Sequence, residues 1–290
     1  MNSSKRLMFI LNPKAGHGLN EGIVDLANEI LKKHFNECVF KKTEFAGHAT
    51  TLAVEAVKNK IDLVVCVGGD GTVNETAQAL KYSETALAII PTGSGNGLAR
   101  HLHIPMNYKK AIALIIEGKK VAIDTFLVND RFAVNLAGVG FDALVAHRFA
   151  ALSVRGLQSY IKTVISSISD FDEMKFTDLL GEQQKAWLLC IANSSQFGNN
   201  ARIAPYAQVN DGLLDIVLVK RPSIMQMIPF AVKMFNGKLG SSKSYKCIRT
   251  KKYTAQFDIA QPIHIDGEPA GMVSSVEVQV IPQSLNIIIA

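Results

Sequence analysis

The stretch that decides the fold reads Leu63-Val64-Val65-Cys66-Val67-Gly68-Gly69-Asp70-Gly71-Thr72. Its first five residues are apolar without a break, which is typical of a strand that is buried on both faces of a parallel sheet. A glycine-rich loop follows, and the apolar spacing from about Val73 to Leu80 then indicates a helix. A strand, a glycine-rich loop and a helix in this order predict an open parallel α/β sheet.

The same alternation extends to either side of this stretch. Further strands are expected at 7–11, 38–44 and 87–90, with helices at 23–31 and 49–58. After Asp124 the pattern changes, because the apolar runs at 126–128 and 132–134 flank Asn129-Asp130 as in a hairpin. Strand-like runs then outnumber helices: strands are predicted at 174–180, 186–193, 213–219, 253–259, 262–266 and 275–281, and helices at 142–150, 155–169 and 223–236. We therefore predict a parallel α/β domain over residues 1–125 and an antiparallel sandwich or barrel over residues 126–282.

Composition excludes several classes of protein. A chain of 290 residues with 48% apolar and 19% charged residues has enough apolar surface for a core and is not a disordered chain. The four cysteines form no C-x-x-C pair, which favours reduced thiols and a cytoplasmic location. The apolar run at 7–11 is too short for a signal peptide, and the uncharged stretch at 186–201 is too polar for a membrane-spanning helix.

The net charge of +6 indicates which kinds of partner suit this protein. It divides evenly, with an excess of +3 before residue 125 and +3 after it, and there is no basic tail. Such a charge suits phosphate substrates and peripheral contact with an anionic membrane. The chain has no helix-turn-helix, zinc or RNP-type pattern and its basic residues are spread out, so we expect no nucleic acid partner.

Three unusual loops are expected at the carboxyl ends of the parallel strands, where ligands bind in such sheets. They cover residues 12–18, 68–75 and 91–97. Their glycines allow the backbone to approach a phosphate, and amides at helix starts bind anions. Any one loop is equally well explained as a tight turn, but three in succession favour a phosphate site. Neither the dinucleotide fingerprint nor the G-x-x-x-x-G-K-[ST] loop is present.

Individual side chains in these loops indicate how a phosphate would be held. Thr72 and Ser94 can donate hydroxyl hydrogen bonds, and Lys14 supplies a point charge. Asp70 is unusual in an anion site and suggests a divalent cation between its carboxylate and the phosphates.

With these motifs the sequence resembles the diacylglycerol kinase catalytic family, which includes bacterial soluble lipid kinases and the sphingosine kinases. Residues 68–72 with Asn74-Glu75 resemble the nucleotide loop of that family, and Asn12-Pro13-x-x-Gly16 resembles its first strand end. Thr43 precedes a Gly-His-Ala segment at 47–49 that lies near ATP in the family. The resemblance thus implies ATP-binding roles for Asn12, Lys14, Gly16, Thr43, Gly68, Gly69, Asp70, Gly71, Thr72, Asn74, Glu75, Gly93, Ser94 and Asn96.

The second half of the chain carries the resemblance further. Residues 138–143 are similar to the glycine-rich start of the family's lipid-binding domain. Residues 211–215 resemble its Asp-Gly metal segment, which implies Asp211 as a side-chain ligand with the carbonyls of Gln208 and Leu213. Residues 265–269 resemble the Asp-Gly-Glu signature that holds the general base, either Asp266 or Glu268. These two carboxylates, two residues apart, would point the same way on an extended segment.

The resemblance implies a lipid kinase that uses ATP and Mg²⁺ to phosphorylate a hydroxyl group of a membrane lipid, either diacylglycerol or a sphingoid-type lipid. Asp70 and Asp211 would support the metal ion, directly or through water. The resemblance also implies an ATP-binding domain over residues 1–125, completed by a last strand at 283–290, and a β-sandwich lipid-binding domain over residues 126–282. Gly97 departs from the pattern, since many bacterial members have an acidic residue there.

Alternatives remain at this point. The nucleotide loop is shared with NAD kinases, so a soluble metabolite kinase is one, and a nucleotide or lipid sensor without turnover is another. A homodimer is compatible with the sequence, which does not fix the oligomeric state. Residues 225–234 form an apolar, methionine-rich stretch that either touches a bilayer or packs inside the protein.

Overall fold

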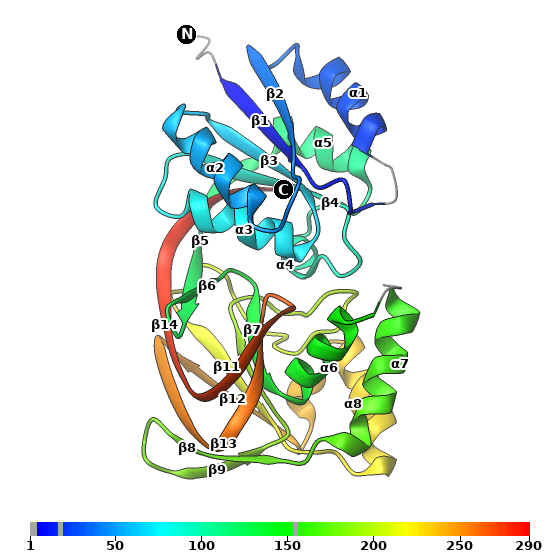
Figure 1. Ribbon diagram of the computed structural model, residues 1–290, viewed down its shortest axis with the longest axis vertical. Coiled ribbons are helices and arrows are strands. Elements are labelled where there is room, and N and C mark those ends of the chain that lie inside the picture. Colours follow the sequence, from blue (N-terminus) through cyan, green and yellow to red (C-terminus); the bar gives the residue numbers. More distant parts are fainter. Residues whose placement is uncertain (1–4, 17–19, 153–155) are drawn as a thin grey trace. The chain divides into compact units, whose positions relative to one another are not determined.

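The computed structural model describes residues 5–16, 20–152 and 156–290. The described chain divides into two compact units (Figure 1). Unit 1 comprises the residues up to Ile123 together with Gln283–Ala290, and unit 2 comprises Asp124–Pro282.

Unit 1 is a parallel sheet with helices on both of its faces. Its strands run in the order β2-β1-β3-β4, all parallel, and the end of the last strand joins β4 in parallel through Ile287 and Leu87. The elements of unit 1 are β1 (Arg6–Leu11), α1 (Asn20–Leu31), β2 (Glu37–Lys42), α2 (His48–Lys58), β3 (Leu63–Gly68), α3 (Asp70–Leu80), β4 (Ala86–Pro91), α4 (Gly97–His101), α5 (Tyr108–Glu117) and the first half of β5 (Lys119–Val128).

The sheet of unit 1 explains why its strands read as unbroken apolar runs. Every residue of β3 and β4 is buried. Alternate side chains such as Phe9 and Val65 pack under α1 and α5, whereas α2 and α3 lie on the opposite face (Figure 1). A sheet covered on both faces leaves no polar side for its central strands.

Unit 2 is built mainly of antiparallel strands, in the order β12-β11-β10-β7-β13-β14. Its elements are β6 (Arg131–Ala133), β7 (Leu136–Gly140), α6 (Phe141–Ala150), α7 (Leu157–Ser167), the 3₁₀ turn η1 (Ile168–Asp170), β8 (Met174–Asp178), β9 (Gln183–Ala186), β10 (Leu188–Ala192), β11 (Leu214–Val219), α8 (Ile224–Phe235), the 3₁₀ turn η2 (Leu239–Ser241), β12 (Tyr245–Thr250), β13 (Lys252–Ile265) and β14 (Glu268–Ile289). The parallel sheet and the antiparallel strands confirm the predicted fold class.

The predicted hairpin at Asn129-Asp130 is confirmed, and the structure explains it. β5 and β6 pair antiparallel across these two residues, whose φ angles are +47° and +63°. Two positive φ angles in a two-residue loop are the mark of a type I′ turn, which Asn and Asp tolerate well.

The structure differs from the predicted elements in several places. The helix expected from Val73 begins at Asp70. The runs at 253–259 and 262–266 belong to one strand, β13, whose pairing with β14 shifts register between Gln256 and Gln261. β12 was not predicted, because this edge strand is half-exposed and rich in polar residues, which hides its apolar pattern.

Candidate functional site

The carboxyl ends of β1 and β3 are tied together by Asn12. Its backbone N–H donates to the carbonyl of Val67 over 2.9 Å, which continues the pairing of the strands. Its side-chain Nδ2 donates to Oγ1 of Thr72 over 2.8 Å. Asn12 thus anchors the end of β1 to the first turn of α3, at the edge where ligands bind in parallel sheets.

Glycines let the three loops approach one another backbone to backbone. A Cβ atom on Gly93 would lie 2.5 Å from the Cα of Gly69. Gly16 has a φ of +79°, and a Cβ there would lie 2.9 Å from the Cβ of Thr92. The hydroxyl Oγ1 of Thr92 is buried at this junction without a hydrogen-bond partner. A buried polar atom of this kind usually has a partner, such as a ligand or a water molecule.

Asp70 organises the loop that follows β4. It is the first residue of α3, and its carboxylate accepts the N–H groups of Asn96 over 2.8 Å and of Gly97 over 2.7 Å. The side chain of Asn96, which has a φ of +54°, closes the loop by bonding the N–H and the carbonyl of Gly93. Gly97 therefore contributes its amide to the carboxylate of Asp70.

The stretch expected to be a long loop is largely the start of a helix. Gly71, Thr72, Asn74 and Glu75 all lie in α3, because Gly69 adopts an extended conformation and serves as the N-cap. The first N–H groups of a helix have no partner within it, and the helix dipole makes this end positive. With the glycine junction and the Thr92 hydroxyl beside it, the arrangement suits a phosphate group.

Glu75 holds the segment that contains Thr43 and residues 47–49. Its two carboxylate oxygens accept the N–H groups of Gly47 over 2.9 Å and of Ala49 over 3.1 Å, at the start of α2. The N–H of Thr43 donates to the carbonyl of Leu11 over 2.9 Å. Glu75 therefore orients this segment at the end of β1.

Lys14 and Ser94 lie on the open side of this edge. Both side chains are exposed, and the backbone N–H of Lys14 donates to Oδ1 of Asn12 over 3.0 Å. Asn74 is half-buried on α3. The structure of unit 1 thus brings Asn12, Asp70, Thr72, Gly93 and Asn96 into direct contact. It leaves the ammonium group of Lys14 and the hydroxyl group of Ser94 accessible.

In unit 2, the Asp-Gly-Glu segment is a tight hairpin turn. Asp266 and Gly267 have φ angles of +48° and +86° and join β13 to β14, with Ile265 paired to Glu268. The expectation that both carboxylates lie on an extended segment is therefore wrong, because an Asp-Gly pair favours the type I′ turn.

The two carboxylates of this turn have different surroundings. Asp266 is only 4% exposed and accepts the backbone N–H groups of Val134, Asn135 and Leu136 over 2.9–3.0 Å. Glu268 is exposed at the start of β14. Asp266 thus holds the connection between β6 and β7, whereas Glu268 is accessible from solvent.

Unit 2 also contains a buried polar cluster that the sequence analysis missed. Asn193 is completely buried, and its Nδ2 donates to the carbonyls of Asp124 over 2.8 Å and of Val134 over 2.9 Å. Its Oδ1 is buried without a hydrogen-bond partner. The hydroxyl of Ser194 bonds Oδ1 of Asn135, the residue whose N–H binds Asp266. The available signal was the run of four polar residues, 193–196, directly after a wholly apolar strand.

A buried His-Asp pair lies next to the turn and was also missed. Nε2 of His264 is 3.2 Å from Oδ2 of Asp142, and both residues are at least 94% buried. The N–H of Gly267 donates to Nδ1 of His264, which leaves Nε2 as the protonated nitrogen facing Asp142. A Cβ on Gly138 would lie 1.9 Å from Oδ2 of Asp142, so any larger residue there would displace the pair. The glycine-rich motif at 138–143 therefore makes room for this pair.

The residues expected to hold a metal ion do not present an open set of oxygen ligands. The carboxylate of Asp211 is ion-paired with Arg249, and its Oδ1 accepts the N–H of Leu213 over 2.9 Å. Gln208 is exposed on the same loop. The guanidinium thus supplies the positive charge that a cation would bring, and these residues do not fit a divalent cation in this arrangement. Among the described residues, no group of three or more His, Cys, Asp or Glu side chains is placed to hold a metal.

The loop around Asp211 has a second internal anchor in Asp124, which is completely buried. Oδ2 of Asp124 accepts the N–H of Gly212 over 2.7 Å, and its own N–H donates to the carbonyl of Val209 over 2.6 Å. Arg249 also lies 3.8 Å from the carboxylate of Asp215, whose pKa is raised by burial. Neither Asp124 nor Arg249 was expected to hold this loop, because nothing in their sequence surroundings marks them.

Comparison with known proteins identifies the family of this chain. Residues 6–128 match the family described as the diacylglycerol kinase catalytic domain, and residues 135–289 match the YegS C-terminal NAD kinase beta sandwich-like domain. A diacylglycerol kinase of Staphylococcus saprophyticus is 25% identical over 276 residues, covering 92% of this chain and 90% of that protein. A diacylglycerol kinase of Bacillus subtilis is 26% identical over 295 residues, covering 92% and 91%.

A solved structure shows the same fold. A putative diacylglycerol kinase from Bacillus anthracis str. Sterne superposes with a TM-score of 0.79 at 24% identity, covering 99% of this chain and 97% of that one. Both matched domains, in the same order and over almost the whole length, confirm the resemblance inferred from residues 12–16, 68–75, 211–215 and 265–269. The chain belongs to the diacylglycerol kinase catalytic domain family of kinases.

Proposed function

We propose that this protein transfers the γ-phosphate of ATP to a hydroxyl group of a membrane lipid. The observation that carries the proposal is the glycine junction of unit 1, where the loops after β1, β3 and β4 meet at the start of α3. The partnerless Oγ1 of Thr92 lies at this junction. Family membership supplies the reaction class.

Phosphoryl transfer depends more on positioning and charge neutralisation than on covalent chemistry by the protein. We assign the phosphates to the first N–H groups of α3, where amides and the helix dipole favour negative charge. The hydroxyls of Thr92 and Ser94 donate hydrogen bonds, and Lys14 adds a positive charge. Asp70 keeps the 93–97 loop in the conformation that this requires.

For the general base we favour Glu268 over Asp266. The carboxylate of Asp266 accepts three backbone N–H groups, whereas a carboxylate has about four acceptor positions in all. Glu268 is exposed, so its carboxylate can reach a substrate hydroxyl and accept its proton. Asp266 then acts as a positioning residue that fixes the turn carrying Glu268.

Magnesium enters this proposal with the nucleotide. Mg²⁺ is commonly held by one or two carboxylates and by substrate phosphates, not by a cage of protein ligands alone. When bound it neutralises phosphate charge. Asp70, at the start of α3, is the carboxylate of unit 1 that we assign to it, directly or through water.

A phosphorylation assay tests the proposal. Purified protein is incubated with γ-labelled ATP, Mg²⁺ and a total lipid extract, and the labelled product is identified by mass spectrometry. We expect a phosphorylated lipid, and diacylglycerol is the first pure acceptor to compare, followed by a sphingoid base. Labelled NADP formed from NAD without lipid would instead show a metabolite kinase. Binding of ATP without transfer to any acceptor would show a nucleotide sensor.

A further inference from the structure

Helix α8 is apolar on two sides, and only one of them packs against the protein. Met227 contacts the cluster of Phe141 and Trp187, while Phe230 and Met234 contact the core around β10 and β11. The start of α8 is fixed by a capping box between Ser223 and Gln226. The inner side of α8 therefore packs against the rest of unit 2 through partly buried side chains.

The outer side of α8 exposes large apolar side chains. The exposed fractions are 89% for Ile224, 89% for Met225, 76% for Ile228, 52% for Val232 and 46% for Phe235. At 3.6 residues per turn, these five residues fall within about 100° of the helix circumference. Such a contiguous apolar face on a surface helix marks a contact site.

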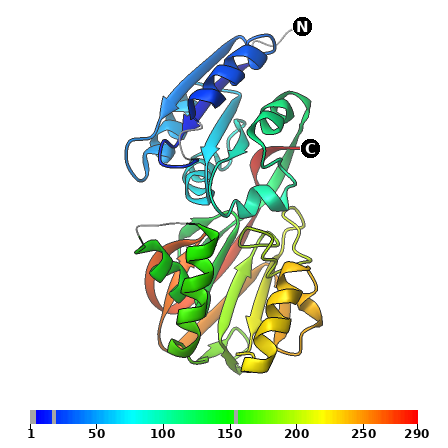
Figure 2. The same cartoon turned by 90° about the vertical axis from the view of Figure 1, so that its right-hand side faces the viewer.

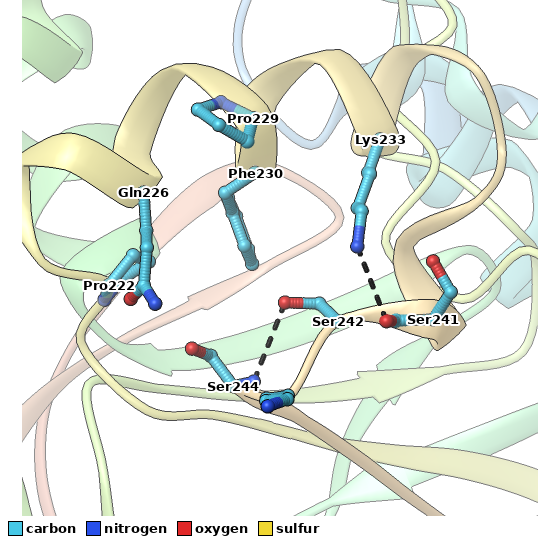
Figure 3. A pocket seen from close by; sticks show the side chains of 9 residues that line it. Pro222, Gln226, Pro229, Phe230, Lys233, Ser241, Ser242 and Ser244 are labelled. Atoms are coloured by element: carbon cyan, nitrogen blue, oxygen red, sulfur yellow. Dashed lines mark hydrogen bonds between the residues drawn. The ribbon is translucent and has the colours of Figure 1, made fainter.

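The third side of α8 is polar. Gln226 and Lys233 point toward the loop at 241–244, and Lys233 donates to the carbonyl of Ser241 over 3.2 Å (Figure 3). Together with Pro222, Pro229 and Phe230 they line a pocket of about 260 Å³. This side carries lysines and hydroxyl groups but no acidic side chain, so it forms a polar border to the apolar face.

The sequence around α8 is strongly basic, although Arg221 is ion-paired with Asp172 and Arg249 with Asp211. Residues 216–257 contain no Asp or Glu. They contain nine basic residues: Lys220, Arg221, Lys233, Lys238, Lys243, Lys246, Arg249, Lys251 and Lys252. The whole chain has a net charge of +6, so the rest of it carries −3. The prediction that the basic residues are spread out is therefore wrong, because counting by halves averaged this segment with its acidic surroundings.

We propose that α8 lies in the plane of an anionic lipid surface, with Ile224, Met225, Ile228, Val232 and Phe235 inserted among the acyl chains. An exposed apolar helix face bordered by lysines is the pattern of interfacial helices. α8 has twelve residues, which is too short to span a bilayer. None of the described helices is long and apolar enough to cross a membrane, so the contact is peripheral.

A lipid surface fits better than a protein partner. A second copy of this chain would bring the same basic segment against α8, and like charges would repel. Anionic headgroups instead attract it, at about 1 kcal/mol for each lysine or arginine near the surface. Helix α7, whose Ile165 is 64% exposed, lies on the same side of unit 2 as α8 (Figure 2).

The inference rests on the proposed function in one respect, namely that the lipid acceptor is held in a bilayer. It is tested without nucleotide. The full-length protein is mixed with phosphatidylcholine vesicles, with or without phosphatidylglycerol, and bound protein is measured by flotation. We expect binding only with phosphatidylglycerol. Met225→Gln with Ile228→Gln should weaken it by about tenfold or more. The matched control is Leu180→Gln with Ile259→Gln, which changes two apolar residues that are 80% and 72% exposed elsewhere in unit 2.

The basic residues are tested separately. Replacing exposed Lys238, Lys243 and Lys246 by Gln should weaken binding by about 100-fold at low salt, and added salt should shrink this difference. Replacing exposed Lys32, Lys33 and Lys58 of unit 1 by Gln is the control with the same change in net charge. Equal losses from both triple variants would overturn the assignment of the surface to α8.

Insertion itself has a spectroscopic readout. The chain has one tryptophan, Trp187, which is 4% exposed and therefore shielded from the bilayer. An added Ile228→Trp should be quenched by brominated lipids, whereas wild-type fluorescence should not change. Absence of quenching, absence of vesicle binding, or a dimer in light scattering that Ile228→Gln dissociates would each overturn the proposal. Because no phosphate transfer is measured, loss of kinase activity alone leaves this result intact.

Discussion

Asp70 links the backbone geometry of the sheet edge to its chemistry. It begins α3, where a negative charge stabilises the helix dipole, and it also bonds the two amides that open α4. The sequence marked Asp70 because a carboxylate is unexpected in a phosphate loop. The hydrogen bonds from Asn96 and Gly97 to Asp70 could not be predicted, since bonds between residues 26 and 27 positions apart depend on the pairing of β3 with β4.

Replacing Asp70 by Asn removes the negative charge of the side chain and keeps its shape. The amide keeps one oxygen for Asn96 or Gly97 but turns its NH₂ group toward the other N–H, which costs about 1–2 kcal/mol of stability. We expect phosphate transfer to fall by about 100-fold or more, because the loop and the local charge both change. Denaturant unfolding and turnover are measured on the same preparation. Turnover at the wild-type rate would refute a role for this carboxylate.

Substitutions of Asp266 and of Glu268 are predicted to have different effects on stability and turnover. Asp266→Ala leaves three buried N–H groups without acceptors, which costs about 3 kcal/mol or more. Glu268→Gln removes an exposed charge and should leave the unfolding midpoint unchanged while abolishing turnover. Exposed Glu29→Gln in α1 is the control. If Glu268→Gln retains full turnover, Glu268 is not the base.

At the scale of single elements, how well a helix or strand could be predicted from the sequence depended on how completely it is buried. β3 and β4 are buried throughout, so their apolar runs gave correct positions. The start of α3 was misplaced, because glycines at 69 and 71 weaken any helical signal from sequence alone. The bend in β13 split one strand into two predicted ones, since the register shift near Gln261 interrupts the alternation.

We expect His101, at the end of the short helix α4, to make the stability of the protein depend on pH. Burial, and to a lesser extent the charge of His103, lowers the pKa of His101 from 6.5 to about 4. Below pH 6.5 the unfolded chain therefore binds a proton that the folded chain does not, so stability falls as the pH drops from 6.5 toward 4. The loss is about 3 kcal/mol at most.

This dependence is checked by measuring unfolding free energies at pH values across that window. His101→Gln should flatten the dependence, because the titrating group is gone. His34→Gln, which changes an exposed histidine between α1 and β2, should preserve it. A wild-type curve that is already flat between pH 6.5 and 4 would show that His101 is accessible to protons in the folded state.

At the scale of the whole molecule, sequence patterns predicted one feature least well. Unit 1 is formed by both ends of the chain. Only the family resemblance implied that residues 283–290 return to the first domain. The apolar run at its end is compatible with many pairings, and pairing over about 200 residues leaves no local signature. The buried contacts of unit 2 around Asn193 and His264 were missed for the same reason.

The return of β14 makes unit 1 depend on the last residues of the chain. Leu285 and Ile287 are completely buried, the N–H of Tyr82 donates to the carbonyl of Ser284 over 2.7 Å, and Nδ2 of Asn286 donates to the carbonyl of Ser83 over 3.0 Å. Ile287→Ala should therefore destabilise unit 1 by about 3 kcal/mol. Exposed Ile259→Ala in unit 2 is the matched control and should change stability by less than about 0.5 kcal/mol.

Hydrogen exchange resolves where the loss occurs. In Ile287→Ala, amides of β3 and β4 should exchange faster, by up to about 100-fold for a 3 kcal/mol loss, while those of β10 and β11 keep their protection. Unit 1 cannot complete its sheet until the final residues are available, so loss of residues 283–290 should leave β4 unprotected even when unit 2 is folded. Full protection of β3 and β4 without these residues would show that the first 123 residues fold independently of the last strand.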